Sequence, residues 1–309
     1  MYYFKKTLIN MLILNTSKLV EIFVVCDDFV KNLEQAPNYA EDFGFLAPDC
    51  RMSKSEIMSI CIFYHHSGIR CFKWFYQSII LGTLHSYFPE ATHYERFNRL
   101  MQEVIRELLA YMILCGLAKP SEANYIDSKK LPVCHIKREK QNRVFKEIAR
   151  KGKSSTGWFF GFKLHVLLNQ WGEIVNFRIT TANIADNNAQ LLRQLFHNFQ
   201  GWVFGDRGYW TKIIKELQDK GIELIPKPKK NQVGLPITPQ QKHYAKKRGI
   251  IESAFDMLQN LMDIDHTRHR SPINFFANLL AGLIGYTFLD HKPHTPMLNP
   301  NDYMKIVLC

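Results

Sequence analysis

The sequence predicts an α/β fold in which a mixed five-stranded sheet with flanking helices follows an all-α segment. Apolar residues recur at helical spacing over most of residues 7–119, whereas the chain from residue 124 onward contains short apolar runs bounded by turn residues, which are typical of strands. The chain has 309 residues, 46% of them hydrophobic, so it can bury a substantial core. We expect a helical domain at 1–119, an α/β domain at 120–292 and a C-terminal tail at 293–309.

The N-terminal region divides into several predicted helices. Ser53 and Glu56 match a capping box at the start of one helix, and Gly68 marks its end. A second helix carrying Arg70 and Lys73 follows this short turn, which is the pattern of a helix-turn-helix that presents basic residues to DNA. An ordinary antiparallel helix pair has the same pattern, and we favour that interpretation on the pattern alone.

The second part of the chain predicts three strands in a meander, followed by helix, strand, helix, strand and helix. Their expected ranges are 124–133, 158–168, 173–180, 187–199, 202–205, 209–220, 222–225 and 239–262. This element order is that of the ribonuclease-H-like fold. A right-handed crossover would place the first and fourth of these strands side by side and parallel.

Three acidic residues stand where this fold would bring distant segments together. Asp127 lies inside a predicted strand, where aspartate is depleted. Asp206 directly follows a strand, in a tight turn that contains Gly208, and strand ends of α/β sheets open into crevices. Glu252 lies beside the apolar face of the last helix. We therefore expect the three carboxylates to converge on one point.

Converging carboxylates have a definite chemistry. They repel one another and stay charged only when a cation is bound, and oxygen ligands suit Mg²⁺ or Mn²⁺. Two such ions promote the in-line displacement of a phosphoryl group. Asp127, Asp206 and Glu252 are thus predicted to be both catalytic and metal-binding residues, although Asp206 alone would also fit a turn or helix cap.

Neighbouring polar residues allow more than one interpretation. Arg248 precedes Glu252 by one helical turn, where it would orient the carboxylate or hold a phosphate. Asp186 fits the N-cap of the following helix better than a metal ligand. His165, next to Lys163 in a strand, fits a packed histidine better than a general base.

The charge of the chain is concentrated near the predicted acids. The net charge is +12 and the pI is about 9.3, which favours a polyanionic partner. Residues 137–153 and 227–248 together hold the whole excess. The predicted DNA-binding residues, from these segments and the N-terminal helices, are Lys137, Arg138, Arg143, Lys227, Lys229, Lys230, Tyr244, Lys246, Lys247, Arg248, Arg70 and Lys73.

Cysteine usage and hydropathy exclude several protein classes. The seven cysteines form no C-x-x-C pair, so reduced core thiols of a cytoplasmic protein are expected and a zinc site is not. The N-terminal apolar run is followed by polar residues rather than a cleavage site, and the apolar run at 279–288 is too short to cross a membrane. We expect a soluble protein.

Five short motifs carry a family resemblance. The segments Tyr125–Ser128, Gly161–His165, Thr181–Asp186, Gly205–Tyr209 and Arg248–Glu252 resemble the DDE transposases of bacterial insertion sequences, most closely the nine-eighty-two group. The similarity covers residues 124–270 well and extends to residues 73–76, 87–89 and 94–97. It implies that Asp127, Asp206 and Glu252 form a catalytic triad that holds two Mg²⁺ or Mn²⁺ ions.

The resemblance also implies partners and a reaction. Such a protein binds the terminal inverted repeats of its own element, cleaves there and joins the ends to target DNA, as a homodimer or larger assembly on the nucleoid. This chain departs from the pattern around the last acid, because three residues separate Tyr244 from Arg248 and Gln259 replaces a usual lysine. Lys246 or Lys247 is then expected to make the contact of that lysine. The alternatives are a metal-dependent nuclease or resolvase without strand transfer, and a domesticated DNA-binding protein.

Overall fold

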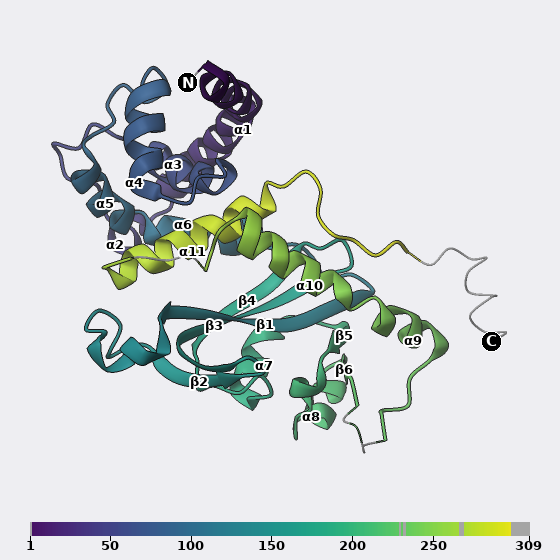
Figure 1. Cartoon of the computed structure of the whole chain (residues 1–309). Helices are drawn as coiled ribbons and strands as arrows, with labels where there is room; N and C mark the ends of the chain where they lie inside the picture. The colour runs from purple at the N-terminus through teal and green to yellow at the C-terminus, as the bar shows by residue number, and fades with distance from the viewer. Residues whose placement is uncertain (1, 229, 231–232, 266–268, 298–309) are drawn as a thin grey trace. The chain divides into compact units, whose positions relative to one another are not determined.

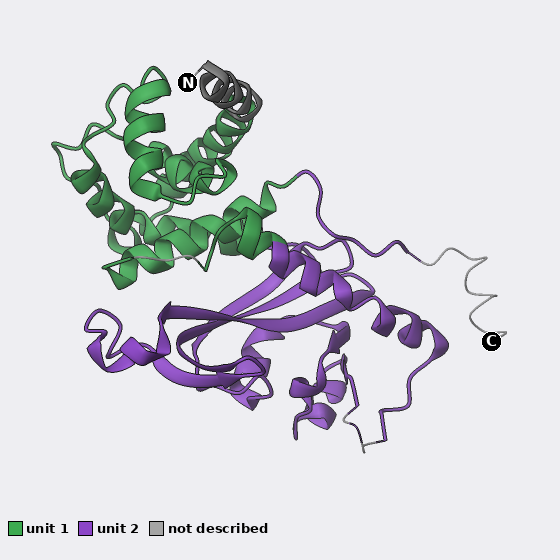
Figure 2. Cartoon of the chain, viewed as in Figure 1, with its two compact units in different colours: residues 1–116, 257–289 green, residues 117–256, 290–309 purple. Residues whose placement is uncertain are grey.

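The computed structural model describes residues 2–228, 230, 233–265 and 269–297, with side chains from residue 16 onward. The chain divides into two compact units, residues 1–116 with 257–289 and residues 117–256 with 290–309 (Figure 2). In this division the segment Met257–Leu289 groups with the N-terminal helices. Lys229 and tail residues 298–309 lie outside the described residues.

The first unit is built of helices over its described residues. They are α1 (Tyr2–Glu34), α2 (Tyr39–Asp42), α3 (Lys54–His66), α4 (Phe72–Trp74), α5 (Tyr94–Glu103), α6 (Ile105–Tyr111) and α11 (Pro272–Thr287), with the π-helices η1 (Phe75–Thr83), η2 (Met112–Gly116) and η5 (Met257–Leu261) (Figure 1). The predicted capping box is present, since the Glu56 N–H donates to Ser53 Oγ at 3.1 Å and the Ser53 N–H to the Glu56 carboxylate at 2.7 Å.

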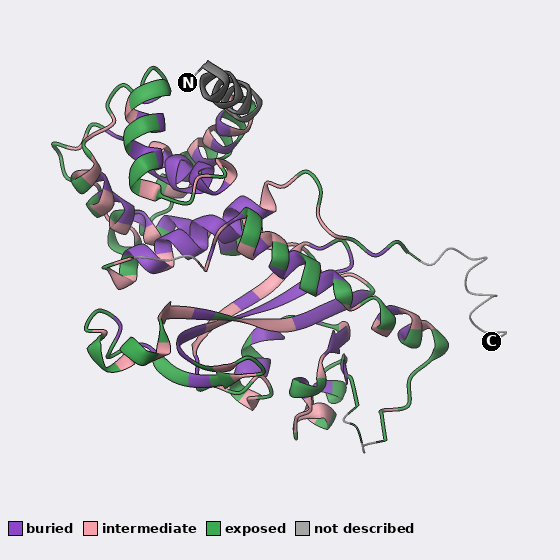
Figure 3. Cartoon of the chain, in the orientation of Figure 1, coloured by how far each residue is buried: buried purple, intermediate pink, exposed green. Residues whose placement is uncertain are grey.

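Helix α11 completes the core of this unit. It packs against α3 and α6, and most of its residues are buried, as are those of α3 (Figure 3). The approach is close, because a Cβ placed on Gly282 would lie 2.5 Å from Ile264 Cγ2 and 3.2 Å from His65 Cε1. This apolar helix therefore fills the interior of the helical unit. Among the described residues, no helix is long and apolar enough to cross a bilayer.

The second unit contains a mixed sheet. Its strands are β1 (Ala123–Cys134), β2 (Arg150–Ser154), β3 (Gly157–Asn169), β4 (Ile174–Thr181), β5 (Gly201–Gly205) and β6 (Ile222–Pro226). The sheet order is β2-β3-β1-β5-β6, and β4 also pairs with β3. β1 is antiparallel to β3 and parallel to β5, so the predicted parallel pairing is confirmed. This arrangement is compatible with a ribonuclease-H-like fold.

Two features of the sheet unit differ from the prediction. The sheet has one strand more than predicted, β2, because Arg150, Lys151 and Lys153 interrupt the apolar pattern that is typical of a strand. Such cations are compatible with a strand at the edge of a sheet, and β2 pairs only with β3. The predicted helix 239–262 is broken into α9 (Pro239–Lys246) and α10 (Gly249–Asp256), followed by η5.

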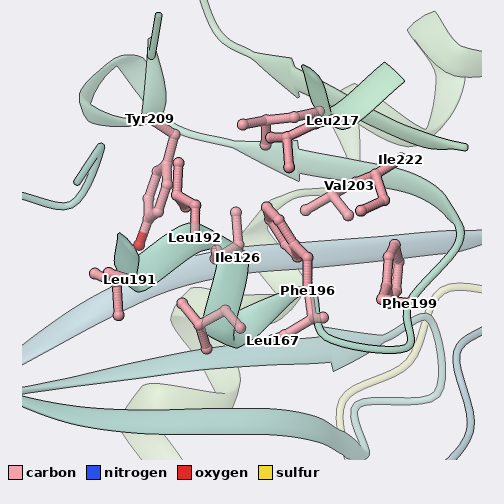
Figure 4. Close-up of a cluster of buried hydrophobic side chains, with 12 residues drawn as sticks. Ile126, Leu167, Leu191, Leu192, Phe196, Phe199, Val203, Tyr209, Leu217 and Ile222 are labelled. Carbon is pink, nitrogen blue, oxygen red and sulfur yellow. The ribbon is translucent and has the colours of Figure 1, made fainter. Parts of the chain in front are cut away.

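One face of the sheet is covered by the shorter helices α7 (Ala189–Leu195) and α8 (Ile214–Asp219). A cluster of buried side chains fills this interface (Figure 4): Ile126, Leu167, Leu191, Leu192, Leu195, Phe196, Phe199, Val203, Tyr209, Leu217, Ile222 and Leu224. Successive side chains of a strand point to opposite faces. Because Ile126 points into this cluster, Asp127 points to the other face of β1, against which α10 packs.

The cysteines follow the expectation only in part. The six described cysteines are free, and Cys26 and Cys61 are buried core thiols as expected. Cys71 and Cys115 are exposed, which the sequence pattern did not indicate.

Candidate active site

Asp127 and Asp206 lie at the same level of two neighbouring parallel strands. The β1–β5 ladder pairs Tyr125 with Phe204, and each aspartate is two residues further along its chain. Asp206 ends its strand as the N-cap of the 3₁₀ turn η4 (Arg207–Tyr209), where the Gly208 N–H donates to Asp206 Oδ1 at 2.7 Å. The Ser128 N–H donates to Asp127 Oδ1 at 2.8 Å. Backbone amides thus hold both carboxylates, that of Asp127 within β1 and that of Asp206 just after the end of β5.

The environment of Asp127 disfavours an isolated negative charge. The pKa of Asp127 is raised to about 6, chiefly by burial and also by the nearby Asp206 carboxylate, while the Ser128 N–H and the Arg248 guanidinium act in the opposite direction. A desolvated carboxylate that faces a second one is stabilised by a cation. The electrostatics of this strand pair therefore favour binding of a positive ion or group.

Arg248 supplies one such positive group. Its Nη1 lies 3.1 Å from Asp127 Oδ2 and its Nη2 lies 2.7 Å from Glu252 Oε1. The expected contact between Arg248 and Glu252 is present although Arg248 lies in the turn between α9 and α10. The side chain of Glu252 is 64% exposed whereas that of Asp127 is 22% exposed, so the arginine links a half-buried acid to one at the surface.

The donor set fits a hard divalent cation in part. Asp127 and Asp206 supply carboxylate oxygens whose repulsion a divalent ion would relieve, and such ligands suit Mg²⁺ or Mn²⁺. Glu252 is joined to Asp127 through the guanidinium, and the described residues contain no group of three or more His, Cys, Asp or Glu close enough to hold a metal. The carboxylate of Glu252 is thus ion-paired with Arg248 in this structure.

Asp186 has a different role from the predicted helix cap. The N-cap of α7 is Asn188, whose side chain accepts a hydrogen bond from the Leu191 N–H at 3.0 Å. Asp186 Oδ1 instead accepts from Ser128 Oγ at 2.9 Å and from Lys163 Nζ at 3.1 Å. The prediction of an N-cap was wrong because two adjacent polar residues, Asn187 and Asn188, also precede this helix and one of them caps it.

His165 is packed inside the sheet, as the sequence predicted. Its side chain is fully buried and its Nε2 is 2.9 Å from Thr180 Oγ1. Burial lowers the pKa of His165 to about 4, with the Asp186 carboxylate acting against that shift. The imidazole is therefore neutral at physiological pH and serves the structure of the sheet.

A comparison with known protein families identifies the domain that contains these acidic residues. Residues 117–272 match the family model described as the transposase DDE domain. The matched segment is just over half of the 309 residues. The chain belongs to the DDE transposase domain family. No curated protein matches the chain.

A cleft beside Glu252 adds basic residues to the DDE domain. It has a volume of about 500 Å³ and combines the cations Lys227, Lys242, Lys246 and Arg248 with an apolar floor that includes Phe204, Ile225, Leu235 and Ile237. Lys227 follows β6, and its N–H donates to the Gly205 carbonyl at 3.1 Å. Lys242 was not among the predicted DNA-binding residues, although it stands in the same basic segment, 227–248.

The other predicted DNA-binding residues of the DDE domain lie in several environments. Lys137 and Arg138 are exposed on η3 (Ile136–Gln141), and Arg143, Lys230 and Lys247 are exposed in connecting segments. Tyr244 is fully buried, and its hydroxyl donates to Glu122 Oε2 at 3.0 Å. Its side chain therefore anchors α9 within the unit and is not available to a DNA phosphate.

Arg70 and Lys73, in the helical unit, are exposed beside a cavity of about 770 Å³ that Tyr64, Phe72 and Tyr94 also line. Lys73 Nζ lies 5.5 Å from the centre of the Tyr94 ring.

Proposed function

We propose that this DDE domain protein is the transposase of an insertion sequence, of the nine-eighty-two group. It binds the terminal inverted repeats of its element, cleaves the DNA there and transfers the ends to target DNA. The observation that supports this most directly is the common level of Asp127 and Asp206 on adjacent parallel strands, with Arg248 joining Asp127 to Glu252.

The three acids are proposed to hold two Mg²⁺ or Mn²⁺ ions within a ribonuclease-H-like catalytic domain. When bound, such ions activate the attacking oxygen and stabilise the leaving oxygen of phosphodiester displacement. The protein contributes position and charge. The backbone amides of Ser128 and Gly208 fix the two aspartates, and Arg248, once released from the carboxylates, is placed to pair with a phosphate.

The basic residues of the two units are proposed to have different roles in DNA binding. Lys227, Lys242 and Lys246 line the cleft that contains Glu252, so they are proposed to hold the phosphate backbone near the scissile bond without reading sequence. Arg70 and Lys73 on the helical unit are proposed to recognise the inverted repeats. Two DNA ends imply a homodimer or larger complex, acting on the nucleoid in the bacterial cytoplasm.

Cleavage and joining of end DNA test this proposal. Asp127→Asn, Asp206→Asn and Glu252→Gln should each reduce Mg²⁺- or Mn²⁺-dependent cleavage of inverted-repeat DNA to background, because each removes a negative ligand and keeps the side-chain shape. Asp219→Asn, on the exposed end of α8, is the matched control and should cleave at the wild-type rate. A thermal unfolding curve for each variant separates loss of chemistry from loss of fold.

Two outcomes would change the assignment. A triad variant that cleaves at the wild-type rate would remove that residue from the site. Cleavage without any joined product, in the presence of target DNA, would favour a metal-dependent nuclease or resolvase over a transposase.

A further inference from the structure

A network of half-buried polar side chains lies beneath the candidate active site, on the face of β1 opposite Arg248 and Glu252. Asp186 is its centre: Oδ1 accepts from Ser128 Oγ at 2.9 Å and from Lys163 Nζ at 3.1 Å. Lys163 Nζ also donates to the Ile184 carbonyl at 2.9 Å. The side chains of Lys163 and Asp186 are only 12% and 28% exposed. Removing polar side chains from water costs free energy unless each of them gains hydrogen-bond partners in the protein.

The network reaches the first acid through Ser128. This residue faces away from Asp127, but its N–H donates to Asp127 Oδ1 while its hydroxyl donates to Asp186. Asp186 therefore fixes the residue whose amide holds the Asp127 carboxylate. A displacement of Ser128 would shift that amide and its acceptor together.

The same carboxylate reaches the second acid through Gly208. A Cβ placed on Gly208 would lie 3.0 Å from Asp206 Oδ1 and 3.7 Å from Asp186 Oδ2. The two carboxylates thus flank the turn whose N–H holds Asp206. Beneath this turn the Tyr209 phenol is fully buried, and Asp127, Asp186 and Asp206 all act on its pKa, which burial raises well above its usual value. Each of these three carboxylates raises the pKa of the phenol further.

We propose that Asp186 is a positioning residue of the active site, which holds Asp127 and Asp206 in the arrangement that binds divalent ions. This inference rests on the proposed function, because it assumes that the two aspartates bind metal. Residues that orient metal ligands commonly change metal affinity by 10–100-fold when they are removed. Lys163 balances the charge of Asp186, so the network supports the site without adding a further unpaired anion.

Binding of Mn²⁺ to the full chain without DNA tests the proposal independently of activity. In calorimetric titrations, Asp186→Asn should bind Mn²⁺ about tenfold more weakly than the wild type. Ser128→Ala should weaken binding in the same direction, because it breaks the link between Asp186 and the Asp127 segment. Asp219→Asn, at the exposed end of α8, is the matched control: it makes the same substitution at a carboxylate that is not a member of the network, so its Mn²⁺ affinity should equal that of the wild type.

The outcomes separate this inference from the proposed function. If Asp127→Asn abolishes Mn²⁺ binding while Asp186→Asn and Ser128→Ala leave it unchanged, Asp186 has only a structural role and the inference is overturned. If the wild type binds no Mn²⁺, the proposed function fails and the inference fails with it. Thermal unfolding in EDTA checks that each variant is folded; should Asp186→Asn not fold, Ser128→Ala decides the question.

Discussion

Arg248 determines whether the carboxylates of the candidate site are paired with a guanidinium or free to bind a metal ion. It joins Asp127 Oδ2 at 3.1 Å to Glu252 Oε1 at 2.7 Å, and so occupies the position between two acids that a divalent ion would also favour. A single guanidinium cannot pair with both carboxylates and with a DNA phosphate in the same geometry. Binding of metal and release of Arg248 to the DNA are therefore expected to be coupled.

This coupling predicts opposite effects of one substitution on two measurements. Arg248→Gln should bind Mn²⁺ up to about fivefold more tightly, because partly exposed ion pairs of about 1 kcal/mol no longer compete for the carboxylates. The same variant should cleave end DNA more slowly, since a phosphate contact is lost. Calorimetry and a cleavage time course measure the two effects. Weaker Mn²⁺ binding by Arg248→Gln would show that the arginine organises the acids instead of competing with a metal.

At the scale of single elements, the close pairing of β1 and β3 constrains the position of the first acid. Gly161 of β3 has φ +156°, and a Cβ there would lie 2.1 Å from the Leu131 carbonyl oxygen of β1. The register between the strands shifts close to this point, between Pro132 and Cys134. The glycine thus permits a backbone approach that a side chain would prevent.

Gly161→Ala should therefore destabilise the protein by about 1–3 kcal/mol or more, because the new methyl group meets backbone and cannot be accommodated by a rotamer change. Gly249→Ala is the control, since a Cβ at Gly249 meets nothing within 4 Å. Urea denaturation of both variants measures the difference. Equal stabilities would contradict the close approach of the two strands.

A buried histidine beneath α11 predicts an acid-sensitive helical unit. Burial lowers the pKa of His65 to about 4, and its Nδ1 is paired with the Met262 carbonyl. The imidazole of His65 takes up a proton near pH 6.5 in the unfolded chain but stays neutral at that pH in the folded protein. Its contribution to the free energy of unfolding is therefore fully present above pH 6.5 and is lost as the pH falls toward 4. The loss is roughly 3 kcal/mol at about 1.4 kcal/mol per pKa unit.

His65→Gln removes this titration and keeps a donor for the carbonyl. The free energy of unfolding of the variant should fall less steeply than that of the wild type between pH 6.5 and pH 4. Other titrating groups contribute equally to both proteins and cancel in the difference. Parallel curves for the two proteins would show that His65 is charged in the folded state.

At the scale of the whole molecule, charge distinguishes the two expected modes of DNA binding. The net charge is +12, and residues 137–153 and 227–248 contain all of the excess. Contacts from such segments to phosphates release counterions and make binding depend on salt without selecting a sequence. Among the exposed cations of the helical unit, Arg70 and Lys73 lie together beside the cavity of about 770 Å³, so they are better suited to recognition of a particular site.

Two pairs of substitutions test this division on the full chain. Lys227→Gln with Lys246→Gln should weaken binding to end DNA and scrambled DNA alike, and reduce the slope of log affinity against log salt by about 2, since each phosphate contact contributes about 0.9. Lys212→Gln with Lys215→Gln, two exposed residues at and before the start of α8, is the control for charge alone. Arg70→Gln with Lys73→Gln should instead reduce the preference for end DNA. If the double variant still prefers end DNA over scrambled DNA, Arg70 and Lys73 do not recognise the inverted repeats.

The sequence by itself determined the elements that carry Asp127 and Asp206. The strand of Asp206 is a short apolar run that ends in a turn, and the strand of Asp127 begins just after a Pro-Ser break. The element order requires a right-handed crossover, so parallel neighbouring strands followed from local pattern and chain chirality. The capping box at Ser53 and the burial of His165 were predictable for the same reason, because each depends on residues close in the chain or on one strand face.

Only the tertiary structure decided which side chains meet across the unit. The bridge from Arg248 to Asp127 and the pairing of Asp186 with Ser128 and Lys163 join residues far apart in the chain, for which periodicity carries no signal. Strand β2 was missed because edge strands tolerate cations that disguise their pattern. Residues 257–289 joined the helical unit because an apolar helix packs on whichever apolar surface it contacts, and its sequence does not specify which one.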